Sequence, residues 1–291
     1  MKILVTGASG NVGSRVVMEL ICLGEEVVAA GTDIKKLHNM FGDKITAAEF
    51  DFNREETYEN ALKDVDRVFL MRPPHLGKPE DIYPFIEALK RHSIRLVSFL
   101  SLMGIEKNKI PPHHKIEKRI EASGIPYSHI RPGFFMQNIT GLHLKEILEE
   151  NTVFIPAGKS RTSFIDASDI GLAAATVLHE PEKHRNSAYT ITGSEALDYY
   201  QVAEILSDLT GRRIKYAKPG LLQYRNYCIK ERGLDRNFVN VTAALYFMTR
   251  MGTAEAITYD FYRLTGKHPK SFSDFVIENI EKFNRDQKKR S

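Results

Sequence analysis

The stretch ILVTGASGNVG at residues 3–13 decides the fold of this 291-residue chain. An apolar strand pattern leads directly into Gly7, Gly10 and Gly13, and an amphipathic helix pattern follows at once. In such a turn, the first glycine permits the tight bend, the second lets the backbone approach a pyrophosphate, and the third lets the helix pack closely on the strand. The start of the helix adds unpaired N–H groups and the positive end of the helix dipole. We therefore predict that this turn binds the phosphates of a dinucleotide.

The spacing of these glycines leaves an alternative open. The pattern is G-x-x-G-x-x-G rather than the usual G-x-G-x-x-G, and a turn of this kind can join a strand and a helix without any ligand. Three glycines cost conformational entropy that a plain turn does not require, which favours the binding role. The residues predicted to contact the cofactor here are Gly7, Ser9, Gly10, Asn11, Val12 and Gly13.

Strand and helix patterns alternate through the first two thirds of the chain. Further apolar strands are predicted at residues 27–30, 45–52, 67–71, 96–101 and 127–131, with helices between them at 55–62, 82–91 and 115–122. Near-continuous apolar strands that alternate with helices indicate a parallel sheet covered on both faces. The predicted fold class is therefore α/β, with a doubly wound parallel sheet of the Rossmann type.

The regular alternation ends after Pro132. We expect a helix, two extended segments, an alanine-rich helix, a returning strand and three more helices, at residues 134–150, 153–156, 162–165, 169–178, 188–192, 199–210, 239–251 and 272–283. The predicted domains are a dinucleotide-binding domain over residues 1–195 and a smaller, mainly helical C-terminal substrate domain over 196–291, with contributions from about 134–160. The smaller domain is expected to cap a pocket at the carboxyl ends of the strands.

Charge and cysteine content exclude several classes of protein. The formal net charge is +4, and the basic residues are dispersed apart from Lys288, Lys289 and Arg290, which are typical of a solvated tail. We therefore expect no nucleic-acid partner. The two cysteines, Cys22 and Cys228, lie in no C-x-x-C motif or His/Cys cluster, so neither a zinc site nor a redox pair is predicted.

Targeting signals are also missing from the pattern. No apolar run approaches the length of a membrane span, and the first residues enter a strand without room for a signal peptide. Few cysteines fit a reducing compartment. The expected location is the cytoplasm, with no membrane partner.

Three positions follow the second strand, where an acidic residue can bind the adenosine ribose of NAD. Asp33 lies about 20 residues beyond the last glycine, as this role requires. Asp33 or Thr32 can equally cap the next helix, and Lys36 can meet a 2′-phosphate. Both interpretations stay open here, so the sequence does not decide between NADH and NADPH.

Two further strand ends carry candidate cofactor contacts. After the third strand, Asp51 can accept a hydrogen bond from an adenine amino group with Phe52 against the ring; the alternative is a turn aspartate beside a core phenylalanine. After the fourth strand, two prolines stop the strand, and the loop with Met71, Arg72 and Pro73 is expected to pass over the nicotinamide-side ribose and the diphosphate.

Several longer motifs make the chain similar to a known family. The segments are ILVTGASGNVG, FLMRPP, LVSFLSLMG, HHKIEKRIEASGIPYSHIRPGFFMQN and YTITGSEALDYYQVAEIL. Together they resemble the NmrA-like family of atypical short-chain dehydrogenases/reductases, over essentially the whole chain. The resemblance implies an NAD(P)-binding Rossmann domain and a small C-terminal substrate domain. It also implies one of two activities, because members are either NAD(P)H-dependent reductases of quinones or azo dyes or cofactor-sensing regulators with little catalysis.

The resemblance also shows two departures. Enzymatic members of the superfamily carry Tyr-x-x-x-Lys on the helix after the fifth strand, and the matching positions here are His113 and Glu117. His113 is the candidate catalytic residue, because histidine can act as a general acid near neutral pH; the alternative is a helix N-terminal role. Relatives that prefer NADPH often place arginine where Thr32 stands, and threonine cannot hold a 2′-phosphate bidentately.

The segment after the sixth strand is expected at the nicotinamide and substrate mouth. Gly133 allows a close backbone approach and, with Phe134, is assigned to the cofactor. Phe135 and Met136 are assigned to the substrate, as part of an apolar wall suited to a flat ring. The alternative is ordinary packing between sheet and cap.

An acidic pair in FIDASDIG raises the question of a metal. Asp166 and Asp169 flank a strand–helix junction, where they favour helix capping and the positive helix terminus. No metal site is predicted.

The leading hypothesis is an NAD(P)H-dependent oxidoreductase that passes hydride to a small aromatic acceptor such as a quinone. The alternative is a non-catalytic NAD(P) sensor that binds a regulatory protein partner. A homo-oligomer is compatible with either hypothesis.

Overall fold

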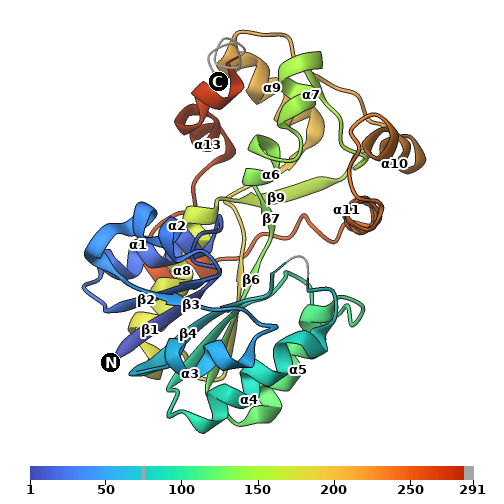
Figure 1. Ribbon diagram of the computed structural model, residues 1–291. Coiled ribbons are helices and arrows are strands. Elements are labelled where there is room, and N and C mark those ends of the chain that lie inside the picture. Colours follow the sequence, from blue (N-terminus) through green and yellow to red (C-terminus); the bar gives the residue numbers. More distant parts are fainter. Residues whose placement is uncertain (74–75, 285–291) are drawn as a thin grey trace. The chain divides into compact units, whose positions relative to one another are not determined.

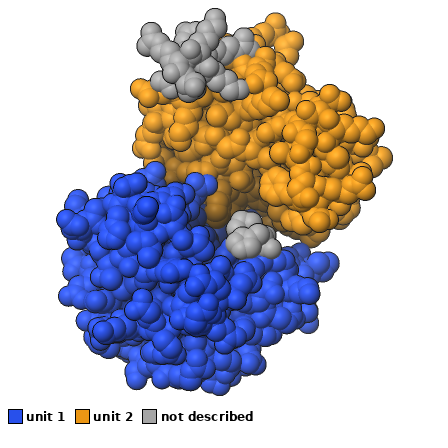
Figure 2. All heavy atoms as spheres, viewed as in Figure 1, with its two compact units in different colours: residues 1–132, 167–191, 259–267 blue, residues 133–166, 192–258, 268–291 orange. Residues whose placement is uncertain are grey.

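The computed structural model describes residues 1–73 and 76–284, and it forms two compact units (Figure 2). Unit 1 comprises Met1–Pro132, Ala167–Ile191 and Tyr259–Lys267. Unit 2 comprises Gly133–Asp166, Thr192–Thr258 and the chain from His268 onward. The domain boundary expected at residue 195 lies near one of the crossings between units and stays a prediction. Pro74 and the basic residues Lys288, Lys289 and Arg290 lie outside the described residues.

Unit 1 is built on a seven-stranded sheet in which every pair of neighbouring strands is parallel. The strand order is β10-β6-β5-β4-β1-β2-β3. The strands are β1 (Lys2–Thr6), β2 (Val27–Gly31), β3 (Thr46–Glu49), β4 (Val65–Met71), β5 (Leu96–Leu100), β6 (Tyr127–Pro132) and β10 (Ser187–Ile191). The direction of winding reverses between β1 and β4, and ligands of open α/β sheets bind at such a switch point. The predicted doubly wound α/β fold is confirmed.

Helices cover both faces of this sheet (Figure 1). They are α1 (Gly13–Cys22), α2 (Ile34–Phe41), α3 (Tyr58–Ala61), α4 (Tyr83–Arg91), α5 (Pro112–Ser123), α8 (Ala167–His179) and α12 (Asp260–Thr265). In Figure 1, α3, α4 and α5 lie on one face, and α1 and α8 lie together on the other. Apolar side chains of α3, α4 and α5 join those of the strands in one core cluster that includes Tyr58, Phe85 and Ile116. A glycine on α8, Gly171, lets α8 approach the backbone of Arg15 on α1.

Unit 2 combines short strands with helices around a core rich in tyrosine and phenylalanine. Its strands are β7 (Phe134–Phe135), β8 (Thr152–Val153), β9 (Arg161–Ile165), β11 (Ala196–Asp198) and β12 (Lys215–Tyr216). Its helices are α6 (Gln137–Thr140), α7 (Leu144–Glu150), α9 (Tyr199–Thr210), α10 (Leu221–Lys230), α11 (Arg236–Arg250) and α13 (Phe272–Glu278). Tyr199, Tyr224, Tyr246, Phe272 and Phe275 are all buried in one cluster.

The structure corrects one predicted helix. The helix expected over residues 134–150 is wrong at its start, because Phe134 and Phe135 form β7 and pair in parallel with Phe164 and Ile165 of β9. Only α6 and α7 remain helical, and Gly141 separates them. A helical periodicity in the sequence does not reveal a strand that is created by pairing with a distant segment.

Across the part of the chain that the structure describes, no helix combines the length and the apolar character needed to span a bilayer.

Candidate functional site

The glycine turn at the end of β1 has the backbone geometry that its three glycines predict. Gly7 has φ +63°, and a Cβ there would collide with the methyl group of Met71. The N–H of Gly10 donates to the carbonyl of Gly7 at 2.9 Å. A Cβ on Gly13 would overlap the Gly7 carbonyl, so only glycine lets α1 begin this close to the strand.

The start of α1 offers donors that nothing in the described chain accepts. The backbone N–H groups of Asn11, Val12 and Gly13 find no acceptor among the described residues. Asn11 is exposed, and the helix dipole adds partial positive charge at this point. Unpaired N–H groups at a helix start bind phosphate oxygens well, so this turn fits a dinucleotide diphosphate.

A buried threonine, which sequence reasoning missed, ties the turn to the neighbouring strand. The Thr6 hydroxyl donates to the carbonyl of Phe69 at 3.1 Å and accepts from the N–H of Met71 at 2.9 Å. These bonds hold the end of β4 against the glycine turn, and they place Met71 beside Gly7. The two segments lie 65 residues apart in the sequence, so only the strand order β1–β4 reveals the contact.

At the end of β2, the capping interpretation of Asp33 is confirmed. Asp33 is the N-cap of α2, and its Oδ1 accepts from the N–H of Lys36 at 2.9 Å. Thr32, Asp33 and Lys36 are all exposed. The cap uses one carboxylate oxygen, and the ribose contact stays a prediction.

After β3, the geometry matches the turn-and-core alternative for Asp51 and Phe52. Asp51 Oδ1 accepts from the backbone N–H of Asn53 at 2.9 Å and from its side-chain amide at 3.2 Å. This local turn ends the strand earlier than the expected residue 52. The Phe52 ring packs edge-on against Phe50 with 4.8 Å between ring centroids, inside the core of unit 1. Contacts of Asp51 and Phe52 with an adenine stay predictions.

Beyond β4, Arg72 and His113 are partly buried polar residues, and the charge of Arg72 acts on His113. The Arg72 guanidinium donates to the carbonyls of Pro73 and Leu76, while its Nε finds no partner in the described chain. His113, in the first turn of α5, lies near Phe99 with 6.0 Å between ring centroids. Burial and then the charge of Arg72 lower the pKa of His113 to about 4. This lowered pKa favours the neutral imidazole at pH 7, and a catalytic role of His113 stays a prediction.

Glu117 occupies the place of the expected lysine and is held by an arginine. Arg131 at the end of β6 donates from Nε to Glu117 Oε1 at 3.0 Å and from Nη2 to Oε2 at 2.7 Å. The Glu117 side chain is 2% exposed and that of Arg131 is 16% exposed. Burial raises the pKa of Glu117, but the hydrogen bonds from Arg131 outweigh it and the pKa is lowered. The pair is thus charged and fixed, and Glu117 offers no positive charge to a ribose.

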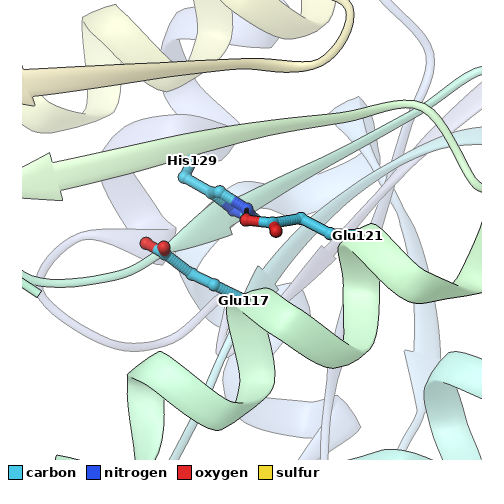
Figure 3. Close-up of side chains that lie close together, drawn as sticks. All are labelled: Glu117, Glu121 and His129. Carbon is cyan, nitrogen blue, oxygen red and sulfur yellow. Dashed lines mark ion pairs between the residues drawn. The ribbon is translucent and has the colours of Figure 1, made fainter. Parts of the chain in front are cut away.

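Figure 3 shows that Glu117 and Glu121 of α5 point toward His129 of β6. Their nearest oxygen and nitrogen atoms lie within 4.8 Å of one another, which is compatible with the ligand types of a metal site. However, Arg131 already binds Glu117, and Lys118 Nζ lies 2.6 Å from Glu121 Oε2. Both carboxylates are therefore neutralised by cations that a metal ion would have to displace. Sequence reasoning missed this cluster because it joins a helix face to a strand.

The predicted nicotinamide and substrate segment begins unit 2. Gly133, Phe134 and Phe135 are partly exposed, whereas Met136 is 1% exposed and belongs to the core of unit 2. The Phe134 ring lies 6.0 Å from the ring of Tyr246, centroid to centroid. Phe134 and Phe135 therefore have surface to offer a ligand, while the side chain of Met136 is used in packing. Their contacts with cofactor or substrate stay predictions.

Comparison with known proteins agrees with this geometry. The model of the NmrA-like family matches residues 1–223. The chain is 30% identical over 284 residues to prestalk A differentiation protein A of Dictyostelium discoideum, covering 96% of this chain and 93% of that protein. It is 27% identical over 287 residues to the NAD(P)H azoreductase of Xenophilus azovorans, covering 97% and 99%.

A solved structure shares the whole fold. It is the NADPH-dependent quinone oxidoreductase of Escherichia coli in complex with NADPH, with a TM-score of 0.85 and 22% identity, covering 96% of this chain and 99% of the other. At this level of identity the likeness concerns the fold.

Proposed function

Because this chain belongs to the NmrA-like family, we propose that it is an oxidoreductase that uses NAD(P)H to reduce a small aromatic acceptor such as a quinone. The observation that carries the proposal is the glycine turn at the switch point of the sheet, with three unpaired N–H groups at the start of α1. When bound, the dinucleotide supplies the hydride. The names of an azoreductase relative and a quinone oxidoreductase of the same fold support an aromatic acceptor.

The environment of His113 favours an acceptor that needs little acid catalysis. The position of the missing tyrosine holds a neutral imidazole, and the position of the missing lysine holds a carboxylate bound to Arg131. A reduced quinone is a stable aromatic product that solvent can protonate. Its reduction depends mainly on orientation in the site rather than on a strong acid. A neutral imidazole still contributes as a hydrogen-bond donor.

The proposal includes both NADH and NADPH. Thr32 cannot form the bidentate contact with a 2′-phosphate that arginine forms. The exposed ammonium group of Lys36, in the first turn of α2, provides a point charge for that phosphate.

One observation favours a second function, a dinucleotide sensor without turnover. The Glu117–Arg131 pair replaces the lysine of the usual catalytic set and leaves no free cation at that position. A relative at 30% identity is named as a differentiation protein, which suits a regulatory role.

Titration with NADH and NADPH, followed by nicotinamide fluorescence, tests the binding step. Adding a simple quinone and following the absorbance of the reduced nicotinamide tests turnover. Binding with oxidation supports the reductase, whereas binding without oxidation across several acceptors supports the sensor.

Gly10→Val provides the variant for this assay. A valine side chain beside the carbonyl of Gly7 crowds the phosphate approach, so we expect loss of dinucleotide binding. Gly220→Val is the matched control, since a Cβ at Gly220 meets nothing within 4 Å and its φ is not positive. Unchanged affinity in Gly10→Val would contradict the assignment of the turn.

A further inference from the structure

Unit 2 contains a cavity whose lining is strongly basic. The cavity measures about 550 Å³. It is lined by the loop before β9, the first residue of β9, Lys218 in the loop after β12, and the end of α11 with the loop that follows. Four of the lining side chains are cationic and one is acidic: Lys159, Arg161, Lys218, Arg250 and Glu255. All of its lining residues belong to unit 2. Its volume lies within the usual range for small-molecule sites.

The side chains of three of these cations are unpaired in the described part of the chain. Within residues 1–73 and 76–284, the side chains of Lys159, Lys218 and Arg250 form no hydrogen bond or ion pair. The fourth, Arg161, is held in place because its Nε and Nη2 donate to the carbonyl of Ala196 at 2.9 and 2.6 Å. The lining therefore carries a net charge of +3, from four cations and one anion. A hollow lined by charges of one sign focuses its field and concentrates counter-ions.

The backbone is shaped to bring these charges together. Gly158 has φ +69°, and a Cβ there would lie 2.9 Å from Arg250 Nε, so the glycine makes room for the guanidinium. Lys218 adopts φ +50°, which is uncommon for a residue other than glycine and turns the chain at the cavity.

We propose that this cavity binds a small phosphorylated molecule, through an anionic group of the size of a diphosphate. A guanidinium group donates two parallel N–H bonds to a pair of phosphate oxygens, and lysine ammonium groups add point charges. This second site goes beyond the proposed reductase function, because none of its residues belongs to the glycine turn or to unit 1.

Isothermal titration of the full chain with inorganic pyrophosphate tests the proposal. We expect the double variant Lys218→Gln/Arg250→Gln to weaken binding by at least tenfold. The double variant Lys230→Gln/Arg236→Gln is the control, since it removes the same charge from exposed residues of unit 2 that do not line the cavity. Lys159→Gln, at another exposed lining residue, is a second variant that is expected to weaken binding while leaving the melting temperature unchanged.

Pyrophosphate could also bind the glycine turn, and Gly10→Val separates the two sites. Gly10→Val is expected to lose NADH and NADPH binding and to keep pyrophosphate binding, whereas Lys218→Gln/Arg250→Gln is expected to do the reverse. Absence of pyrophosphate binding, equal loss in the control variant, or loss in Gly10→Val alone would each overturn the proposal. If pyrophosphate binds at the cavity but no dinucleotide binds anywhere, the reductase proposal fails and the cavity proposal stands.

Discussion

At the scale of single residues, Glu117 stands where enzymatic relatives carry a lysine. The position therefore has a negative charge in place of a positive one. If the dinucleotide binds as proposed, an unpaired carboxylate at that place would repel its oxygens. Arg131 removes this repulsion by binding both oxygens of Glu117. The substitution is therefore tolerated because a residue from the neighbouring strand compensates it.

A double-mutant cycle measures this compensation. Glu117→Gln leaves the largely buried Arg131 charge with only the more exposed Glu106, 3.4 Å away, as a partner. We therefore expect a loss of about 3 kcal/mol in the free energy of unfolding, at the low end for broken buried ion pairs. Glu117→Met/Arg131→Met removes both charges and is expected to recover most of that loss. Urea unfolding measures both variants. Glu49→Gln, which breaks the exposed Arg54–Glu49 pair, is the control and should change little. If Glu117→Met/Arg131→Met has no higher free energy of unfolding than Glu117→Gln, then Arg131 does not compensate the charge of Glu117.

At the scale of elements, the contact between α1 and α8 depends on one glycine. An ideal Cβ at Gly171 would lie 2.5 Å from Arg15 Cβ and 3.0 Å from its carbonyl carbon, so neither helix can approach as closely once that position has a side chain. We expect Gly171→Ala to lower the free energy of unfolding by about 1–3 kcal/mol, the usual cost of overpacking. Gly77→Ala, where a Cβ meets no neighbour and the residue caps no helix, is the matched control in thermal unfolding. Equal free energies of unfolding for the two variants would mean that α1 and α8 can move apart without loss of stability.

Some of these elements could be predicted from sequence patterns, and others could not. The parallel strands of unit 1 were predictable because they are short, continuous apolar runs bounded by turn residues, as in β4 and β5. The glycine turn was predictable because its function depends on residues that are close in sequence. Strand β7 was not, because it forms only by pairing with β9, about 30 residues away.

Parts of the candidate site were hidden for the same reason. Thr6 and Met71, Glu117 and Arg131, and the four segments around the basic cavity are each brought together by topology. The lowered pKa of His113 was not visible in the sequence, because it depends on burial and on the charge of Arg72, which lies on a different segment of the fold.

At the scale of the whole molecule, buried histidines make stability depend on pH. His143 is 2% exposed and shares a hydrogen bond of 2.5 Å with the Tyr246 hydroxyl. Burial and then the charge of Arg232 lower the pKa of His143 to about 3. Burial likewise lowers the pKa of His113 to about 4. Both imidazoles are therefore neutral in the folded protein at pH values where they are protonated in the unfolded chain.

Because both pKa values are lowered in the folded protein, its stability falls as the pH falls. Between pH 6.5 and about 4 the unfolded chain binds more protons, so stability is full above pH 6.5 and falls as the pH falls, by up to about 1.4 kcal/mol per pH unit for each histidine. Urea unfolding at pH 7.5, 6 and 5 measures the slope. His143→Gln is expected to flatten it, whereas His38→Gln, at an exposed position, should not. A slope unaffected by His143→Gln would contradict the assignment.

Unit 1 is formed by three separate segments of the chain, and this affects how it folds during synthesis. Helix α12 packs against β10 and α8, and the Asp260 carboxylate accepts from the N–H of Thr190 at 2.9 Å. Residues 259–267 are made only after most of unit 2, which includes residues 133–166 and 192–258. Domains usually fold one after another from the N-terminus as they emerge. Here the nascent Rossmann sheet must wait for a helix encoded some 70 codons after its last strand, so translation speed through unit 2 sets how long that sheet stays incompletely covered.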